Sequence, residues 1–488
     1  MSRSKLFSKN SKRTGNRSHG CRCSCICLPA AESNRYFHLL ERHPYLCSLF
    51  VCLLLNALYF GGEAYLAQNA VLLETLALLA AGAAVLWRLV RYQPQKKPAA
   101  VCVSVVYTLL VLAGAWCYHE ARHSGLWVLV GGCAVLSGLF WLTRKQYHNQ
   151  RRRVSLLLLG TSFLLKFFYV CYTPITRRQH DVGKFGDADN HAGYITYLLQ
   201  HHQLPDFDPR GHWQFYHPPL HHMISALWLW LSEHVFGISN AASQESLQTL
   251  SLFYAMAIVI TAYRILRHFR LEGIALYAPL AVVAFHPSFI LFSGSINNDA
   301  LSVVFILGAV LWTLKWYEKQ TWEGIVKIAL CIGLGMMTKL SAAMVAIPVA
   351  AVFLVVLVRQ LRQRNWRILG QLGGFAVICF PLGLWYPVRN LVRFGVPLTY
   401  VQEMPENSVQ YLGEQSFLSR ILDFSPHQVA SVFEQWVQRT GGSYNEYNPL
   451  IALLKNAMFG EYINEYTLDC SLRSEERRVG KECRSRWS

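Results

Sequence analysis

The sequence predicts an all-α, polytopic membrane protein with one long extracytoplasmic loop. The chain of 488 residues is 53% hydrophobic and only 15% charged, whereas soluble domains carry about 25% charge. Apolar runs of about 20 residues recur along it, each long enough to cross a hydrocarbon core as a helix. The net charge of +18 comes largely from cations between these runs, as the positive-inside rule requires. This distribution favours a membrane protein over a nucleic-acid-binding protein.

The chain is expected to begin with a basic cytoplasmic tail (1–43), because no apolar segment of a signal peptide follows directly. Four apolar segments then form an N-terminal membrane extension (44–150), and a second group forms a membrane core (151–397). The expected helices of both groups are 45–61, 69–88, 99–118, 124–142, 154–173, 247–265, 273–292, 299–317, 325–338, 341–358 and 368–387.

Alternation of these helices from a cytoplasmic N-terminus places the loop 174–246 outside. The segment 220–237 is apolar, but if it crossed the membrane, the cations 264–270 would also lie outside. We therefore expect an interfacial or re-entrant helix there, with its tryptophans at the headgroup level.

The C-terminal part has a different composition. Residues 398–472 are expected to form an extracytoplasmic segment of loops and short helices. The last residues, "RSEERRVGKECRSRWS" (473–488), resemble a translated sequencing adapter, so we interpret them as non-native and the natural chain as truncated before them.

Ionisable residues gather at the start of the outer loop, in "RRQHDVGKFGDADNH" (177–191). Asp181 follows an expected helix end by a few residues, at the depth of a lipid headgroup. A carboxylate there could take a proton from an attacking hydroxyl, and Arg178 could contact a phosphate. A solvated ion pair between these two residues is the alternative interpretation. Asp187 and Asp189 are alternative acids, in a stretch that is also typical of a turn.

Histidines concentrate in the same loop, with nine of the eighteen between 180 and 234. Such enrichment on one membrane face suggests a site, although a polar loop without a shared role would look similar. His180, His191, Tyr216 and His217 are the candidates for the substrate cavity. The step Tyr216-His217-Pro218-Pro219 could also serve only to turn the chain back towards the membrane.

Two further features lie at helix ends on the same side. Asn298 and Asp299 begin the expected helix 299–317, where helix capping explains one of them and a cavity role could explain the other. Lys339 and Arg389 are expected at membrane level on the outer face, against the positive-inside bias. A cation there is costly and is either functional or snorkels to the interface, and both residues are candidates to contact an anionic phosphate.

In this order, these features resemble the membrane-embedded glycosyltransferases of the GT-C type. The likeness is to the superfamily of protein O-mannosyltransferases and aminoarabinose transferases (glycosyltransferase family 39-like). Its elements are Asp181, "YITYLLQHHQLPD", "YHPPL", "INNDALS", "GLGMMTKLSA", "WYPVRNLVRFGVPL" and "FGE", between about Arg151 and Tyr462.

The resemblance implies a GT-C-like helical bundle that transfers a sugar from a polyprenyl-phosphate donor to an acceptor hydroxyl, with inversion. Asp181 would be the general base, and Lys339, Arg389 and Arg178 would contact the donor phosphate. Many members have an Asp-Glu pair where this chain has His180-Asp181, which leaves Asp187 and Asp189 open as the working acid.

No cofactor is expected to be required, although a divalent metal could assist, with His180, Asp181 and His191 as conceivable ligands. The expected partners are the lipid-linked sugar, an unidentified acceptor and the bilayer, and no nucleic acid. The expected location is a bacterial cell membrane, with the site on the extracytoplasmic side. The alternatives are a flippase for lipid-linked sugars, which would need a polar path through the membrane, and a non-catalytic partner of such an enzyme.

Overall fold

A computed structural model describes residues 42–54, 150–172, 175, 182–398, 400, 416–423, 448–450 and 453 of the chain. The chain divides into two units, 1–47 and 48–488. Residues 42–47 are the described part of the first unit, where the N–H of Cys47 donates to the carbonyl of His43 at 3.0 Å. The predicted domain boundaries stay predictions.

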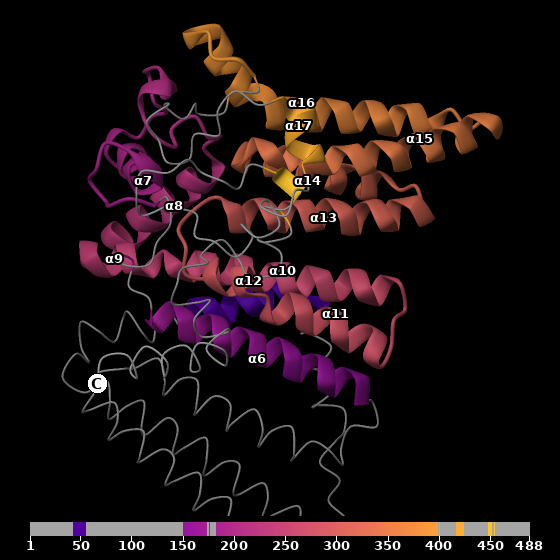
Figure 1. Cartoon of the computed structure of the whole chain (residues 1–488), viewed down its shortest axis with the longest axis horizontal. Coiled ribbons are helices and arrows are strands. Elements are labelled where there is room, and N and C mark those ends of the chain that lie inside the picture. The colour runs from indigo at the N-terminus through magenta and orange to yellow at the C-terminus, as the bar shows by residue number, and fades with distance from the viewer. Residues whose placement is uncertain are drawn as a thin grey trace, which may run out of the picture. The chain divides into compact units, whose positions relative to one another are not determined.

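The described residues of the second unit contain helices and no strand, which confirms the all-α fold class (Figure 1). Besides a helix Pro44–Leu54 that begins in the first unit, the α-helices are α6 (Gln150–Tyr172), α7 (Asn190–His201), α8 (Leu220–Trp230), α9 (Asn240–Ser246), α10 (Gln248–His268), α11 (Ile274–Phe285), α12 (Pro287–Leu291), α13 (Asp299–Glu318), α14 (Trp322–Thr338), α15 (Ala346–Arg362), α16 (Arg367–Phe394) and α17 (Phe417–Leu422). Short helices of other types are η2 (Pro209–Gly211), η3 (Leu231–Val235) and η4 (Leu340–Val345).

Five stretches of helix are long and apolar enough to cross a membrane, which confirms the polytopic prediction for the described part of the chain. They are Val154–Cys171, Asn240–His268, Asp299–Glu318, Leu340–Arg362 and Arg367–Phe394. Each matches a segment expected from hydropathy. The expected helices 69–88, 99–118 and 124–142, most of the tail 1–43 and of the segment 398–472, and the residues 473–488 lie outside the described residues.

The prediction of one continuous span over 273–292 is wrong. The helix breaks after Phe285, and α12 starts at Pro287, because proline has no N–H to continue the backbone ladder. The carbonyl of Ala284 accepts hydrogen bonds instead from Lys166 Nζ and Ser162 Oγ of α6, both at 2.8 Å. The buried lysine of α6 therefore satisfies a broken helix end.

The segment 220–237 folds as α8 followed by the π-helical turn η3, and it is not among the five candidate spans. One face of α8 is buried, whereas Met223, Leu227 and Trp230 are exposed at helical spacing. An exposed apolar stripe on a short helix is typical of a membrane interface, and the interfacial position stays a prediction.

The expected helix 325–338 is α14, which begins three residues earlier and packs between α13 and α16. Small residues allow this close approach: a Cβ on Gly333 would come within 2.8 Å of the Leu382 side chain on α16, and one on Gly335 within 3.2 Å of Phe305 on α13. The ends of α13, α14 and α16 are thereby held together.

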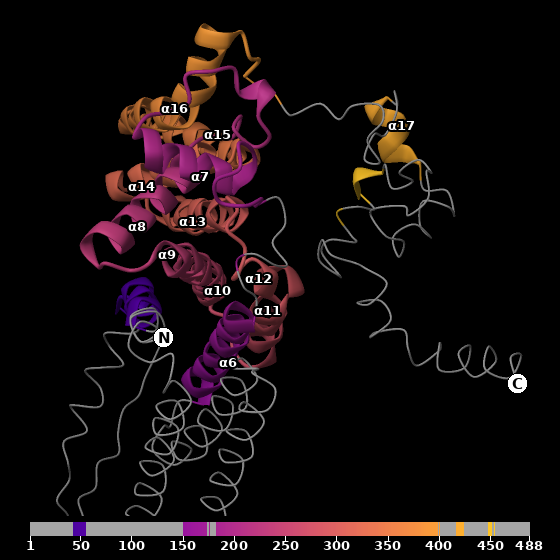
Figure 2. The ribbon, with the colours of Figure 1, turned by 90° about the vertical axis from the view of Figure 1, so that its left-hand side faces the viewer.

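The outer loop 182–219 and α8 pack over these helix ends. Tyr194 and Phe215 share one hydrophobic core with Leu250 of α10 and Leu301 of α13. Figure 2 shows α8 beside α14, with which it is in contact. The outer loop therefore has a packed core of its own on the membrane helices.

Candidate functional site

A cavity of about 460 Å³ opens where the outer loop meets the ends of α13, α14 and α16. Its wall comes from α7, the turn before α8, the start of α13, the junction of α14 with η4, and the residues around the end of α16. The polar lining residues are His191, Gln214, Tyr216, His217, Asn297, Asp299, Lys339, Ser341, Asn390 and Tyr400.

The lining of the cavity includes an ion pair. Lys339 directly follows α14, Asp299 is the first residue of α13, and Lys339 Nζ donates to Asp299 Oδ1. The side chains are 28% and 30% exposed. Behind them, the side-chain amide of the buried Asn298 donates to the carbonyl of Thr338 at 3.0 Å. The two helix ends are thus linked by a charged and a neutral contact.

A group of histidines lies at the cavity as well, with His191 and His217 in its lining. His191 stacks between His217 and His222, with ring centroids 5.7 and 5.1 Å apart. His191 Nδ1 lies 2.8 Å from His222 Nε2, and His221 Nε2 donates to the carbonyl of Ile296. These rings form an aromatic wall that is mostly buried.

Burial keeps these imidazoles uncharged. It lowers the pKa of His217 and of His222 well below the ordinary range, helped by Lys339 at His217 and by His191 at His222. It lowers the pKa of His221 to about 4, although the Ile296 carbonyl acts in the opposite direction. Because burial disfavours the charged form, His217, His221 and His222 are neutral hydrogen-bonding groups at pH 7.

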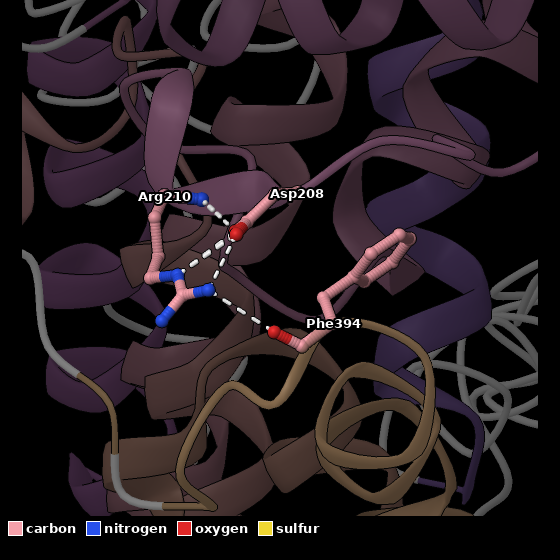
Figure 3. A network of polar contacts seen from close by, with 3 residues as sticks. All are labelled: Asp208, Arg210 and Phe394. Carbon is pink, nitrogen blue, oxygen red and sulfur yellow. Dashed lines mark hydrogen bonds and ion pairs between the residues drawn. The ribbon is translucent and has the colours of Figure 1, made fainter.

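Three cross-links clamp the outer loop to the end of α16. Arg210 donates to both carboxylate oxygens of Asp208 and, at 3.0 Å, to the carbonyl of Phe394 (Figure 3). Arg393 pairs with Asp206. The guanidinium of Arg210 lowers the pKa of Asp208. These contacts join the outer loop to the C-terminal end of α16.

Arg389 contributes the third cross-link. Its Nη2 donates to the carbonyl of Pro205 at 2.5 Å, and its Nη1 to Asn390 Oδ1 at 3.0 Å. Asn390 lines the cavity, whereas Arg389 is not among the lining residues. A phosphate contact of Arg389 stays a prediction, and its described contacts hold the outer loop.

The predicted acids are placed differently from one another. Asp187 is exposed, and its carboxylate accepts from the N–H of Lys184 at 3.2 Å within a turn. Asp189 accepts from the N–H of Trp213 at 3.0 Å and does not line the cavity. Asp181, His180 and Arg178 lie outside the described residues.

The structure thus brings His191, Tyr216, His217, Asp299 and Lys339 to one cavity. Sequence reasoning missed five further polar lining residues, which are Gln214, Asn297, Ser341, Asn390 and Tyr400. Gln214 and Asn390 lie inside the motifs "WQFYHPPLHH" and "WYPVRN", but no periodicity marks a cavity-lining amide.

A metal site is not apparent in the ranges that the structure describes. No group of three or more His, Cys, Asp or Glu residues there could hold an ion. Of the conceivable ligands, His191 is the one described, and its Nδ1 is engaged with His222.

Comparison with known families matches residues 217–385 to the model of dolichyl-phosphate-mannose-protein mannosyltransferases. No curated protein and no solved structure matches the chain. The matched segment runs from α8 through most of α16 and contains His217, Asp299 and Lys339 of the cavity. The match supports the resemblance of this multi-pass membrane protein to GT-C type membrane glycosyltransferases, over the matched residues.

Proposed function

We propose that the protein transfers a sugar from a polyprenyl-phosphate donor to an acceptor hydroxyl, at the extracytoplasmic ends of its membrane helices. The observation that carries the proposal is the cavity, which pairs one cation with a wall of neutral hydrogen-bonding groups. A sugar phosphate is complementary to it, because its phosphate is anionic and its hydroxyl groups are neutral. The family match over residues 217–385 includes His217, Asp299 and Lys339 of this cavity.

The donor phosphate would bind Lys339, the one Lys or Arg among the described residues that line the cavity. Its partner Asp299 holds the ammonium at the cavity wall, so a phosphate would share or replace this contact. A charge-assisted hydrogen bond to phosphate is short and strong. Arg178 and Arg389 remain further candidates for this contact.

The cations at the helix ends far from the cavity indicate on which side of the membrane the cavity would lie. These carry a second set of cations, which includes Arg264, Arg267, Lys315, Lys327, Arg359 and Arg362. The cavity lies instead at the start of α13 and the end of α14. Because cytoplasmic loops carry the excess of Lys and Arg, the cavity would face away from the cytoplasm, as in a bacterial cell membrane.

Asp181 is our candidate for the general base. It directly precedes Val182, which is fully buried and whose carbonyl accepts from the N–H of Ala192 at 2.7 Å. Ala192 adjoins the cavity residue His191. The base would take the proton of the acceptor hydroxyl while the sugar–phosphate bond breaks. Attack opposite the leaving phosphate inverts the anomeric centre, and the phosphate keeps the bonding electron pair.

The proposed step requires no metal ion or other cofactor. The phosphate is already a good leaving group, and positioning together with proton removal supplies the catalysis. Transfer that continues after treatment with a chelator is the expected result. Loss of transfer that Mg²⁺ or Mn²⁺ restores would assign a metal to the site.

The decisive experiment replaces the base. Asp181→Asn should reduce transfer from dolichyl-phosphate mannose by about 100-fold or more, with an unchanged amount of folded protein. Asp187→Asn is the matched control, because Asp187 is an exposed turn residue of the same loop. Full activity of Asp181→Asn would refute the assignment, and loss in the control variant would move the base to Asp187.

A further inference from the structure

The helix ends far from the cavity carry a cluster of cations around one indole ring. Three helices meet there, and α13 packs between α10 and α14 (Figure 1). The ammonium of Lys315 on α13 lies 4.4 Å from the ring centroid of Trp312, and that of Lys327 on α14 lies 4.0 Å from the same ring. Arg264 of α10 and Lys327 both act electrostatically on Lys315. Cations from three helices therefore repel one another around Trp312.

Lys315 has no acidic partner among the described residues. Lys327 pairs with Glu323 one turn away on α14, whereas Lys315 forms neither a hydrogen bond nor an ion pair with the described part of the chain. The Lys315 side chain is partly buried, so its ammonium is partly removed from water. It thus presents N–H donors for which the described chain supplies no acceptor.

The cluster lies at the depth expected for lipid headgroups. Lys315 is three residues before the end of α13 at Glu318, and Arg264 is four residues before the end of α10 at His268. At a rise of about 1.5 Å per residue, both lie about 5–6 Å inside their helix ends. Both helices are long and apolar enough to cross a membrane, and tryptophan is enriched at the level of the headgroups. An anion bound here would therefore belong to the bilayer.

The charges of the cluster restrict the chemistry of that anion. Of the groups that act on Lys315, two are cations and one, Glu323, is an acid, so positive charge is in excess. Lysine and arginine both form charge-assisted hydrogen bonds to phosphate oxygens. The ammonium of a zwitterionic headgroup would be repelled by the excess charge, whereas an anionic headgroup has no such group. Basic pockets between membrane helices on the cytoplasmic side bind anionic headgroups.

We infer that Lys315 and Arg264 form a binding site for the phosphate of an anionic phospholipid. The site is separate from the cavity, which lies at the start of α13 and the end of α14. By the positive-inside rule the lipid would come from the cytoplasmic leaflet. The bound phosphate offsets the repulsion between the two cations and links the ends of α10 and α13.

The test measures lipid binding to the full chain, purified in detergent, by native mass spectrometry. The probes are phosphatidylglycerol, which is anionic, and phosphatidylcholine, which is zwitterionic. The wild-type protein should bind phosphatidylglycerol more tightly. In Lys315→Met its dissociation constant should rise about tenfold or more, because a hydrogen bond to a charged group is lost. Lys315→Arg keeps the charge and should bind as the wild type does, and Arg264→Met should weaken binding as Lys315→Met does.

Arg359→Met is the matched control. Arg359 lies three residues before the end of α15, on the same side of the membrane as the cluster. Its Nη2 already donates to the hydroxyl of Tyr317 at 2.8 Å. The control removes the same charge as Lys315→Met. General attraction to anionic lipid contributes about fivefold per cation, so it would fall equally in both variants. A loss of tenfold or more in Lys315→Met alone identifies a direct contact.

Three results would overturn the inference. Equal losses in Lys315→Met and Arg359→Met would assign the binding to general attraction. Equal affinity of the wild type for both lipids would exclude an anionic site. Displacement of phosphatidylglycerol by inorganic phosphate would replace the lipid by a free phosphate ion. Lys315→Met is expected to fold, because it removes repulsion, and Lys315→Gln takes its place if its unfolding midpoint falls. No measurement involves sugar transfer, so failure of the proposed function leaves this test unaffected.

Discussion

Replacing Lys339 by methionine should impair donor use far more than it impairs folding. The ammonium is the described cation of the cavity and pairs there with Asp299. Methionine keeps an unbranched side chain of similar length and removes the charge. A phosphate bound to Lys339 would therefore lose a charge-assisted hydrogen bond, whereas the helix ends would keep the contact between Asn298 and Thr338.

The size of both effects follows from the structure. A hydrogen bond to a charged group contributes about 1.5–3 kcal/mol, so kcat/KM for the lipid-linked donor should fall about 10- to 150-fold. The ion pair itself is about 30% exposed on both sides, and such pairs contribute about 1 kcal/mol or less to stability. The thermal unfolding midpoint should therefore change little.

Lys327→Met provides the matched control at the other end of α14. Lys327 also pairs with an acid, Glu323, and its Nζ lies 4.0 Å from the ring centroid of Trp312. The assay follows transfer of radiolabelled mannose from dolichyl-phosphate mannose, together with the unfolding midpoint of each variant. Activity of Lys339→Met within threefold of the control variant would refute the phosphate contact.

Two further predictions concern the outer loop. Tyr386→Phe should destabilise the loop by about 1–3 kcal/mol, because it leaves the carbonyl of Phe215 and the hydroxyl of Tyr194 without their described partner; faster amide exchange over 203–217 checks this. Tyr254→Phe removes a buried hydroxyl without a partner among the described residues and should leave exchange unchanged, so equal exchange in the two variants would contradict the reasoning. The free energy of unfolding should also fall between pH 6.5 and about 4, because the pKa of His221 is lowered to about 4 in the folded state and the unfolded chain binds more protons in that window. An unfolding midpoint that stays level or rises on acidification across this range would exclude that contribution, whose full size is on the order of 3 kcal/mol.

Hydropathy located the membrane helices well and failed where a single residue changed the backbone. Runs such as 299–317 and 368–387 reappear as α13 and α16 because a membrane span needs only length and apolar composition. The segment 273–292 has the same composition but breaks at Pro287. Only the tertiary structure shows that Lys166 of the neighbouring helix α6 donates to the carbonyl of Ala284 at this break.

Sequence reasoning about the site succeeded for residues at helix ends on one face of the membrane. Asp299 and Lys339 are separated by 40 positions, and topology alone predicted the same side for both. Their direct contact came from the close packing of α13 on α14. Arg389 met the same criteria, yet its guanidinium contacts the outer loop at Pro205, because side-chain direction on a helix is not a property of membrane depth.

The sequence by itself determined the class of the protein, the order of its membrane helices and the face on which polar residues gather. These three properties depend on composition and on spacing along the chain, and both can be read from residues that are close together in sequence. Tertiary structure alone decided which polar groups share a cavity and that burial keeps His217 neutral there. Burial and hydrogen bonding depend on segments far apart in sequence, and no local pattern records them.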